Sequence, residues 1–206
     1  MTEDTTYAGG KANSPGVEFL LLLRLVNYYF LLIPFIFVIL ISALILNGLF
    51  PFTKSSLENL ALLICFFFST ACVIKFLICR QLFYLWCFGL TLTFFAREVH
   101  FAGTSAAVYF SLLLHLFLAL NFREKFSPYL RQPVFLTALA TGFTCYFISQ
   151  TTDQRWWRGF PYEAVVHVPL EESLEIIGHL IVGSTLLIWH PLRNKIKSSG
   201  SRNEKP

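Results

Sequence analysis

The chain has 206 residues, of which 55% are hydrophobic and 14% charged, and its formal net charge is +4. A soluble domain of this length would carry amphipathic stripes and a charged surface, whereas here the apolar residues form long runs. The basic residues lie at the ends of these runs and form no stripe, so the charge indicates membrane topology and no nucleic-acid partner. The composition excludes a conventional aqueous core and predicts an integral membrane protein in contact with the lipid bilayer.

Residues 1–16 are rich in small and polar residues and predict a flexible N-terminal tail. Six apolar runs follow, and they predict six transmembrane helices, so the expected fold is an all-α polytopic membrane helix bundle. The runs cover residues 25–46, 57–78, 82–95, 105–122, 133–149 and 174–189. They define a six-helix membrane domain over residues 17–192, and residues 193–206 form a basic cytoplasmic tail.

The third run is the shortest. With roughly 14 residues it cannot cross a hydrocarbon core of about 30 Å without help from the residues that follow. The polar sequence Arg97-Glu98-Val99-His100 directly after it is therefore expected at membrane depth.

Lysine and arginine set the orientation of the bundle. If both termini are cytoplasmic, 12 of the 16 basic residues fall on the cytoplasmic side, which is a strong positive-inside bias. Seven acidic residues then fall on the outer side, where the long connection 150–170 also lies; they are Glu58, Glu98, Asp153, Glu163, Glu171, Glu172 and Glu175. The aromatic residues of this connection predict a belt that holds it against the lipid headgroups.

Two polar motifs lie at the predicted outer ends of spans. Glu172, Glu175 and His179 have helical spacings of i, i+3 and i+7, so they share one face at the start of the last span. Glu171 is four residues before Glu175, so its carboxylate is also close. Together with the Arg97-Glu98-x-His100 motif and Asp153, the three residues of this face are expected to converge in one outward-opening pocket. There are two alternatives. Glu171 and Glu172 could simply occupy the first turn of a helix, where negative charge is favourable. Arg97 and Glu98 could form a solvated cap at the end of the third span.

The residue types suggest roles in a metal-assisted reaction. His100, His179, Glu175 and Asp153 are the candidate ligands for a divalent metal such as zinc, with manganese or iron as alternatives. Glu172 and Glu98 are candidate acid–base groups, and Arg97 or Arg155 would stabilise a developing oxyanion. The competing interpretation is that the arginines form structural salt bridges with the glutamates.

His115 lies near the middle of the fourth span, where an unpaired polar group is costly. It is expected to hydrogen-bond across helices to Thr141 or Ser69, or to bind a cofactor.

The motifs Arg97-Glu98-x-His100 and Glu171-Glu172-x-x-Glu175 resemble those of small multi-pass proteins of bacterial inner membranes. The resemblance covers about a quarter of the chain. It implies a bacterial plasma-membrane location and assigns no activity.

Three function classes remain open. The first is a metal-assisted hydrolase or transferase that acts on a lipid or lipid-linked substrate. The second is a non-catalytic assembly subunit that binds a membrane-protein partner through the outer aromatic loop. The third is an ion-coupled transporter, which requires polar groups across the midplane of the membrane. His115 is nearly the only such residue there, which argues against this class.

Overall fold

The computed structural model describes residues 15–99 and 104–188, and within these ranges all regular elements are helices. They follow one another as α1 (Pro15–Arg24), the 3-10 helix η1 (Tyr28–Leu32), α2 (Ile33–Leu46), α3 (Lys54–Cys79), α4 (Leu82–Glu98), α5 (Thr104–Asn121), α6 (Arg123–Leu130), α7 (Pro133–Asp153) and α8 (Glu163–Ile188). The all-helical fold expected from the sequence is confirmed for this part of the chain.

Three helical segments of the described chain are long and apolar enough to cross a membrane. They are Tyr28–Leu46, Lys54–Cys79 and Pro133–Asp153. A fourth is Ala107–Asn121 with Arg123–Leu130, if this pair, bent by 99°, counts as one span. The short α4 and the glutamate-containing α8 fall outside this group. Six spans with cytoplasmic termini therefore stay a prediction.

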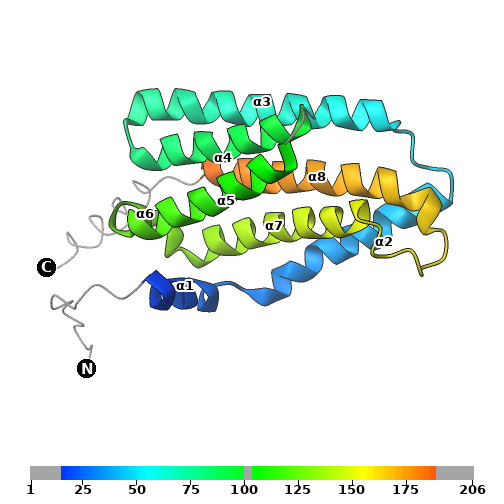
Figure 1. The fold of residues 1–206 in the computed structure, drawn as a ribbon, viewed down its shortest axis with the longest axis horizontal. Helices are drawn as coiled ribbons and strands as arrows, with labels where there is room; N and C mark the ends of the chain where they lie inside the picture. Colours follow the sequence, from blue (N-terminus) through cyan, green and yellow to red (C-terminus); the bar gives the residue numbers. More distant parts are fainter. Residues whose placement is uncertain (1–14, 100–103, 189–206) are drawn as a thin grey trace, which may run out of the picture.

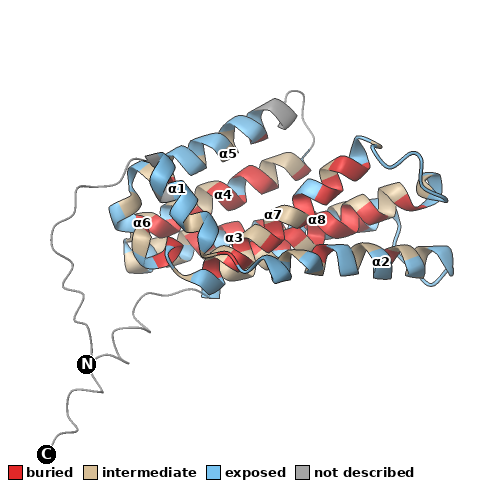
Figure 2. Cartoon of the chain, turned by 90° about the horizontal axis from the view of Figure 1, so that it is seen from below, coloured by how far each residue is buried: buried red, intermediate tan, exposed pale blue. Residues whose placement is uncertain are grey.

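The interior of the bundle contains buried polar side chains, while many large apolar side chains are exposed on its surface. Figure 2 shows buried residues concentrated on α3, α4, α7 and α8, whereas α2 and α5 are largely exposed. Among the buried side chains are the hydroxyls of Thr91, Thr141 and Ser149, while Phe66 and Phe110 are exposed. Because lipid is as apolar as leucine, such helices associate through polar groups and close packing instead of an apolar stripe.

Helix ends are set by local sequence. Thr53 caps α3 in a capping box with Ser56, in which each side chain binds the backbone N–H of the other residue. Arg80 ends α3 in the left-handed conformation with a φ of 53°, and α4 starts two residues later. Pro133 begins α7, where its missing N–H has no cost. These signals make α3 and α4 an antiparallel hairpin.

The unequal lengths of the helices position the site. Figure 1 places the α2–α3 connection and the α7–α8 loop at one end of the bundle, which we call the loop end, and α6 at the opposite end. Helix α4 has 17 residues and α3 has 26, so α4 stops short of the loop end. Its last turn therefore lies beside Glu175, which is ~18 Å along α8 from Glu163 at 1.5 Å per residue.

Glycines allow the central helices to approach closely. A Cβ atom on Gly183 of α8 would lie 2.2 Å from the ring of Phe68 on α3. One on Gly142 of α7 would lie 2.5 Å from Val182 of α8. Gly178 faces the ring of Tyr146, where a Cβ would lie 3.0 Å from the ring carbons. Small residues at these crossings bring the polar side chains of α7 and α8 within hydrogen-bonding reach.

We expect Gly183→Ala to lower the free energy of unfolding by about 1–3 kcal/mol, because the Phe68 ring must move to accept the methyl group. Thermal unfolding of the detergent-purified protein measures the effect. Gly159→Ala is the matched control, since a Cβ there has no heavy atom within 4 Å. Equal unfolding midpoints for the two variants would contradict the described contact between α3 and α8.

Candidate functional site

A buried imidazole lies at the centre of the bundle. Its Nδ1 is 2.6 Å from the hydroxyl of Tyr146 on α7, and its Nε2 is 3.1 Å from Oε1 of Glu98 on α4. His179, which carries this ring on α8, is 2% exposed, Glu98 is 4% and Tyr146 is 8%. Three helices that are distant in sequence therefore meet at one ring, and both ring nitrogens have a partner.

The direction of these hydrogen bonds follows from the chemistry of the groups. An ionised carboxylate only accepts, so with Glu98 ionised the Nε2 of His179 donates to it. In a neutral imidazole Nδ1 is then the acceptor, and the Tyr146 hydroxyl donates to it. The carboxylate thereby fixes the tautomer that presents a basic nitrogen to the tyrosine.

A second set of contacts lies one turn away. The Arg97 guanidinium donates to Oε1 of Glu175, and the Ser149 hydroxyl donates to the same oxygen over 2.7 Å. This ion pair is mostly buried, with the side chain of Arg97 21% exposed and that of Glu175 5%. A buried carboxylate is tolerated when it is both paired and hydrogen-bonded.

The two sets are parts of one network because each helix contributes a neighbouring pair. Helix α4 supplies Arg97 and Glu98 at its last turn. Helix α7 supplies Tyr146 and Ser149 at i and i+3, and α8 supplies Glu175 with His179 at i and i+4. Within each of α7 and α8 the two side chains lie on the same face. We call these six residues the polar network.

Aromatic rings fix the position of the tyrosine. The Phe94 ring stacks on that of Tyr146 with centroids 4.7 Å apart, and it meets the imidazole of His179 at 5.7 Å. On the other side Gly178 leaves room for the Tyr146 ring. The hydroxyl is thus held toward the imidazole by packing as well as by its hydrogen bond.

A cavity of about 220 Å³ adjoins the polar network between α4, α5 and α7. Arg97 and Tyr146 line it, together with Gln150 and apolar side chains, among them Phe143 and Phe147. The buried His179 is absent from this lining and lies behind the tyrosine. A molecule in the cavity would meet a guanidinium and a tyrosine side chain, with the imidazole as the tyrosine's hydrogen-bond partner.

Two carboxylates lie between this network and the loop end, ahead of the predicted sixth span. Burial raises the pKa of Glu171 to about 8, and the nearby Glu175 and Asp153 carboxylates add to the shift. Burial likewise raises the pKa of Glu172 to about 7, with Glu175 as the next cause. Glu172 lies 4.0 Å from Nζ of Lys54 at the start of α3.

Arg155 and Asp153 lie apart from the polar network. Arg155 holds both carboxylate oxygens of Glu163 at 3.1 and 2.8 Å, and this hydrogen bonding lowers the pKa of Glu163. Asp153 is exposed and accepts a hydrogen bond from the Gln150 amide at 3.1 Å. His100 lies outside the described residues. The structure therefore joins Arg97, Glu98, Glu175 and His179 directly and places Glu172 one turn beyond them.

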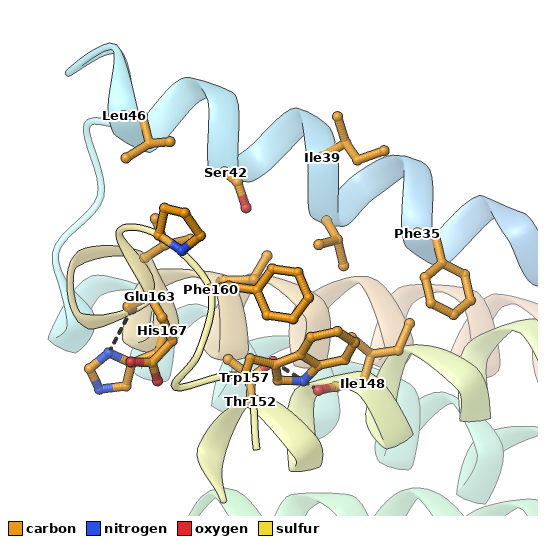
Figure 3. Close-up of a pocket in the computed structure, with 14 residues that line it drawn as sticks. Phe35, Ile39, Ser42, Leu46, Ile148, Thr152, Trp157, Phe160, Glu163 and His167 are labelled. Carbon is orange, nitrogen blue, oxygen red and sulfur yellow. Dashed lines mark hydrogen bonds between the residues drawn. The ribbon is translucent and has the colours of Figure 1, made fainter. Parts of the chain in front are cut away.

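A second cavity of about 330 Å³ lies at the loop end between α2, α7 and the start of α8. Figure 3 shows Trp157 and Phe160 of the loop reaching over it toward Phe35 and Ile39 of α2. Several of its polar groups are engaged, since the Trp157 indole donates to Thr151 and His167 bonds the backbone oxygen of Glu163. We therefore place the candidate site at the first cavity.

Within residues 15–99 and 104–188 no group of three or more His, Cys, Asp and Glu side chains has metal-binding geometry. Glu175 and His179 make the contacts described above, and His100 is not described. A divalent metal such as zinc at these positions stays a prediction from the sequence.

The expected partners of His115 were wrong. Its Nδ1 bonds the backbone oxygen of Ser111 in the same helix at 2.7 Å, whereas Thr141 donates to the Thr137 carbonyl. The side chain also packs against α4, where a Cβ on Gly89 would lie 2.7 Å from its Nε2. The Nδ1 of this ring is therefore satisfied by the backbone of its own helix.

Tyr146 and Ser149 were not among the residues selected from the sequence. Their signal is a pair of hydroxyls at i and i+3 in the apolar run 133–149. Such a pair on one helical face points to a polar partner on a neighbouring helix.

No protein-family model, curated protein or solved structure matches the chain. The function proposed below is therefore argued from the site itself.

We expect the protein to be more stable at pH 5 than at pH 8. Glu171 and Glu172 have raised pKa values when folded, so the folded state holds more protons than the unfolded state between pH ~4.5 and ~8. Their contribution is fully present below pH ~4.5 and is lost as the pH rises through 7 to 8.

Thermal unfolding in detergent across this pH range tests the expectation. The double variant Glu171→Gln, Glu172→Gln should show a flatter profile than the wild type. Glu124→Gln, an exposed carboxylate on α6, is the matched control and should retain the wild-type slope. A wild-type midpoint that rises from pH 5 to pH 8 would contradict the assignment.

Proposed function

We propose that the protein is a membrane hydrolase or transferase that cleaves an ester bond of a lipid by acid–base catalysis. The observation that carries the proposal is the hydrogen-bonded series Tyr146–His179–Glu98, with the tyrosine on the wall of a cavity beside Arg97. A nucleophile or acid, a base and a group that orients the base are the recurring parts of such sites.

In the proposed reaction the attacking water gives its proton to the Tyr146 oxygen while the tyrosine passes its own proton to Nδ1 of His179. The water oxygen bonds to the ester carbon, and the carbonyl oxygen takes up the negative charge. Collapse of this intermediate breaks the ester bond, and the leaving alcohol receives the proton back from His179 through Tyr146. In a transferase a second hydroxyl compound replaces the water.

Arg97 would stabilise the oxyanion in this scheme. Its guanidinium carries several N–H donors in a plane, and one of them is used by Glu175. Glu175, which itself accepts from the Ser149 hydroxyl, holds the side chain in place, so little reorganisation accompanies the charge development. Fixed donors in a dry site stabilise a developing charge much more than they would in water.

The base in this proposal differs from the one expected from the sequence. Glu172 was the candidate there, but its carboxylate lies toward Lys54 and is absent from the cavity lining. The tyrosine and histidine are closer to the space that a substrate would occupy. Arg155, bound to Glu163, has a structural role here.

An assembly role is the second candidate function. It is supported by the exposed aromatic residues of the α7–α8 loop, in which Trp156, Phe160 and Tyr162 are each more than half exposed. Such side chains serve equally well at the lipid headgroups. If the loop binds a partner, replacing all three residues by serine would lower the recovery of that partner and leave ester cleavage intact.

The test uses vesicles of phosphatidylcholine, phosphatidylethanolamine and phosphatidylglycerol with isotope-labelled acyl chains, into which the purified protein is reconstituted. Mass spectrometry follows labelled fatty acid, lysolipid and transfer products. Tyr146→Phe keeps the stacked ring and removes the hydroxyl, and we expect it to lower the rate by about 10² or more. His179→Gln should lower it to a similar extent.

Tyr129→Phe is the matched control. Tyr129 is also buried, but its hydroxyl bonds Gln81 at the opposite end of the bundle, so ester cleavage should continue. Unfolding midpoints of all variants separate lost chemistry from lost folding. Wild-type protein without a labelled product, or a folded Tyr146→Phe with the wild-type rate, would overturn the proposal.

A further inference from the structure

A third hollow, larger than the two cavities described above, adjoins the cavity beside the polar network. It has a volume of about 560 Å³ and lies between α1, α4, α5, α6 and α7. Tyr109, Leu112 and Phe143 line both spaces. The two hollows therefore adjoin each other along α5 and α7, and we call them together the α5–α7 groove.

The polarity of the groove changes along its length. Its end near the polar network has Arg97, Tyr146 and Gln150 in the lining. The larger part is lined almost entirely by leucine and other apolar side chains, and its one basic side chain, His115, is bonded within α5. A molecule that fills the groove must be polar at one end and hydrocarbon over the rest.

The length of the groove also fits a lipid chain. From Gln150 to Leu136 on α7 the lining spans 14 residues, or ~21 Å at 1.5 Å per residue. One leaflet contributes about half of a hydrocarbon core of about 30 Å, so an acyl chain of ordinary length can occupy most of the groove. Gln150 lies only three residues, or ~5 Å, from the end of α7.

The polar end selects the chemistry of the bound group. Arg97 and the Gln150 amide offer N–H donors, whereas the hydroxyl hydrogen of Tyr146 is donated to His179. Among the described residues no carboxylate lines either hollow. Glu175 lies behind Arg97 and orients it, and Glu98 lies behind His179. Ester and phosphate oxygens of a lipid are acceptors and match this arrangement.

We propose that the α5–α7 groove binds one acyl chain of a bilayer glycerolipid, with the ester oxygens of that chain at Arg97 and Tyr146. The proposal rests on the proposed function for the fate of this ester and adds the substrate class and its orientation. The chain runs from the polar network toward α6, so the lipid enters sideways from the bilayer past the exposed helix α5.

Photo-crosslinking tests the occupant and its direction. The wild-type protein is reconstituted in phosphatidylcholine nanodiscs that contain a trace of one of two phosphatidylcholine probes. One probe carries a diazirine near the ester of the acyl chain, and the other carries it at the chain terminus. After illumination and proteolysis, mass spectrometry locates the labelled residues.

We expect the ester-proximal probe to label Tyr109 and Phe147 and the terminal probe to label Leu120 and Leu136. Both should label the groove severalfold more than the exposed faces of α2 and α3. Even labelling of all exposed helices, or the reverse order along the groove, would overturn the proposal.

Ala140→Trp fills the groove from α7 and should reduce labelling severalfold. Ala138→Trp is the matched control, two residues away and outside the groove lining, and it should leave labelling unchanged. Equal labelling of the two folded variants would also overturn the proposal. Because the readout is binding, a labelled groove without ester cleavage would contradict only the proposed function, and cleavage without groove labelling would contradict only this inference.

Discussion

The two hydrogen bonds of the His179 ring constrain much of the structure around them. An imidazole at this depth cannot turn to water, so each nitrogen needs a partner from another helix. Glu98 and Tyr146 meet this need only if α4, α7 and α8 lie at fixed heights and rotations. The close helix crossings at Gly142 and Gly178 then follow, because longer side chains would hold α7 and α8 too far apart for a 2.6 Å contact.

The position of the polar network depends on the short helix α4. A helix that matched α3 in length would carry Arg97 and Glu98 nearer the loop end, close to Glu171 and Glu172. Four carboxylates would then compete for one guanidinium. Because α4 ends early, Arg97 pairs with Glu175, and the two outer glutamates remain partly buried without a strong cation. Burial is the main cause of their raised pKa values, and the charge of Glu175 adds to it.

Part of this arrangement could be predicted from the sequence. The short third run placed Arg97 and Glu98 at depth, and the spacing of Glu175 and His179 placed both on one face of the last helix. The convergence of α4 with α8, however, depends on tertiary packing, which a helix that is apolar on every side does not encode. Tyr146 and Ser149 were missed for the same reason, since the i and i+3 spacing of their hydroxyls indicates one shared face but does not show which helix that face meets. Arg155 pairs locally with Glu163, eight residues away across the α7–α8 loop, so its distance from the network follows from loop geometry.

In the proposed reaction, the charges of the network would favour proton transfer toward the histidine. With both carboxylates ionised, Glu98 and Glu175 carry two negative charges against the single positive charge of Arg97. A proton that moves from Tyr146 to Nδ1 of His179 makes the imidazole positive. The net charge of the buried residues then approaches zero, and Glu98 already accepts a hydrogen bond from this imidazole. The charge that remains in the cavity then faces Arg97. Separation of this kind, with the cation stabilised behind the tyrosine and the anion in front of it, is what preorganised electrostatic catalysis requires. The same polarity explains why the groove lining holds donors and apolar side chains while the carboxylates stay behind them.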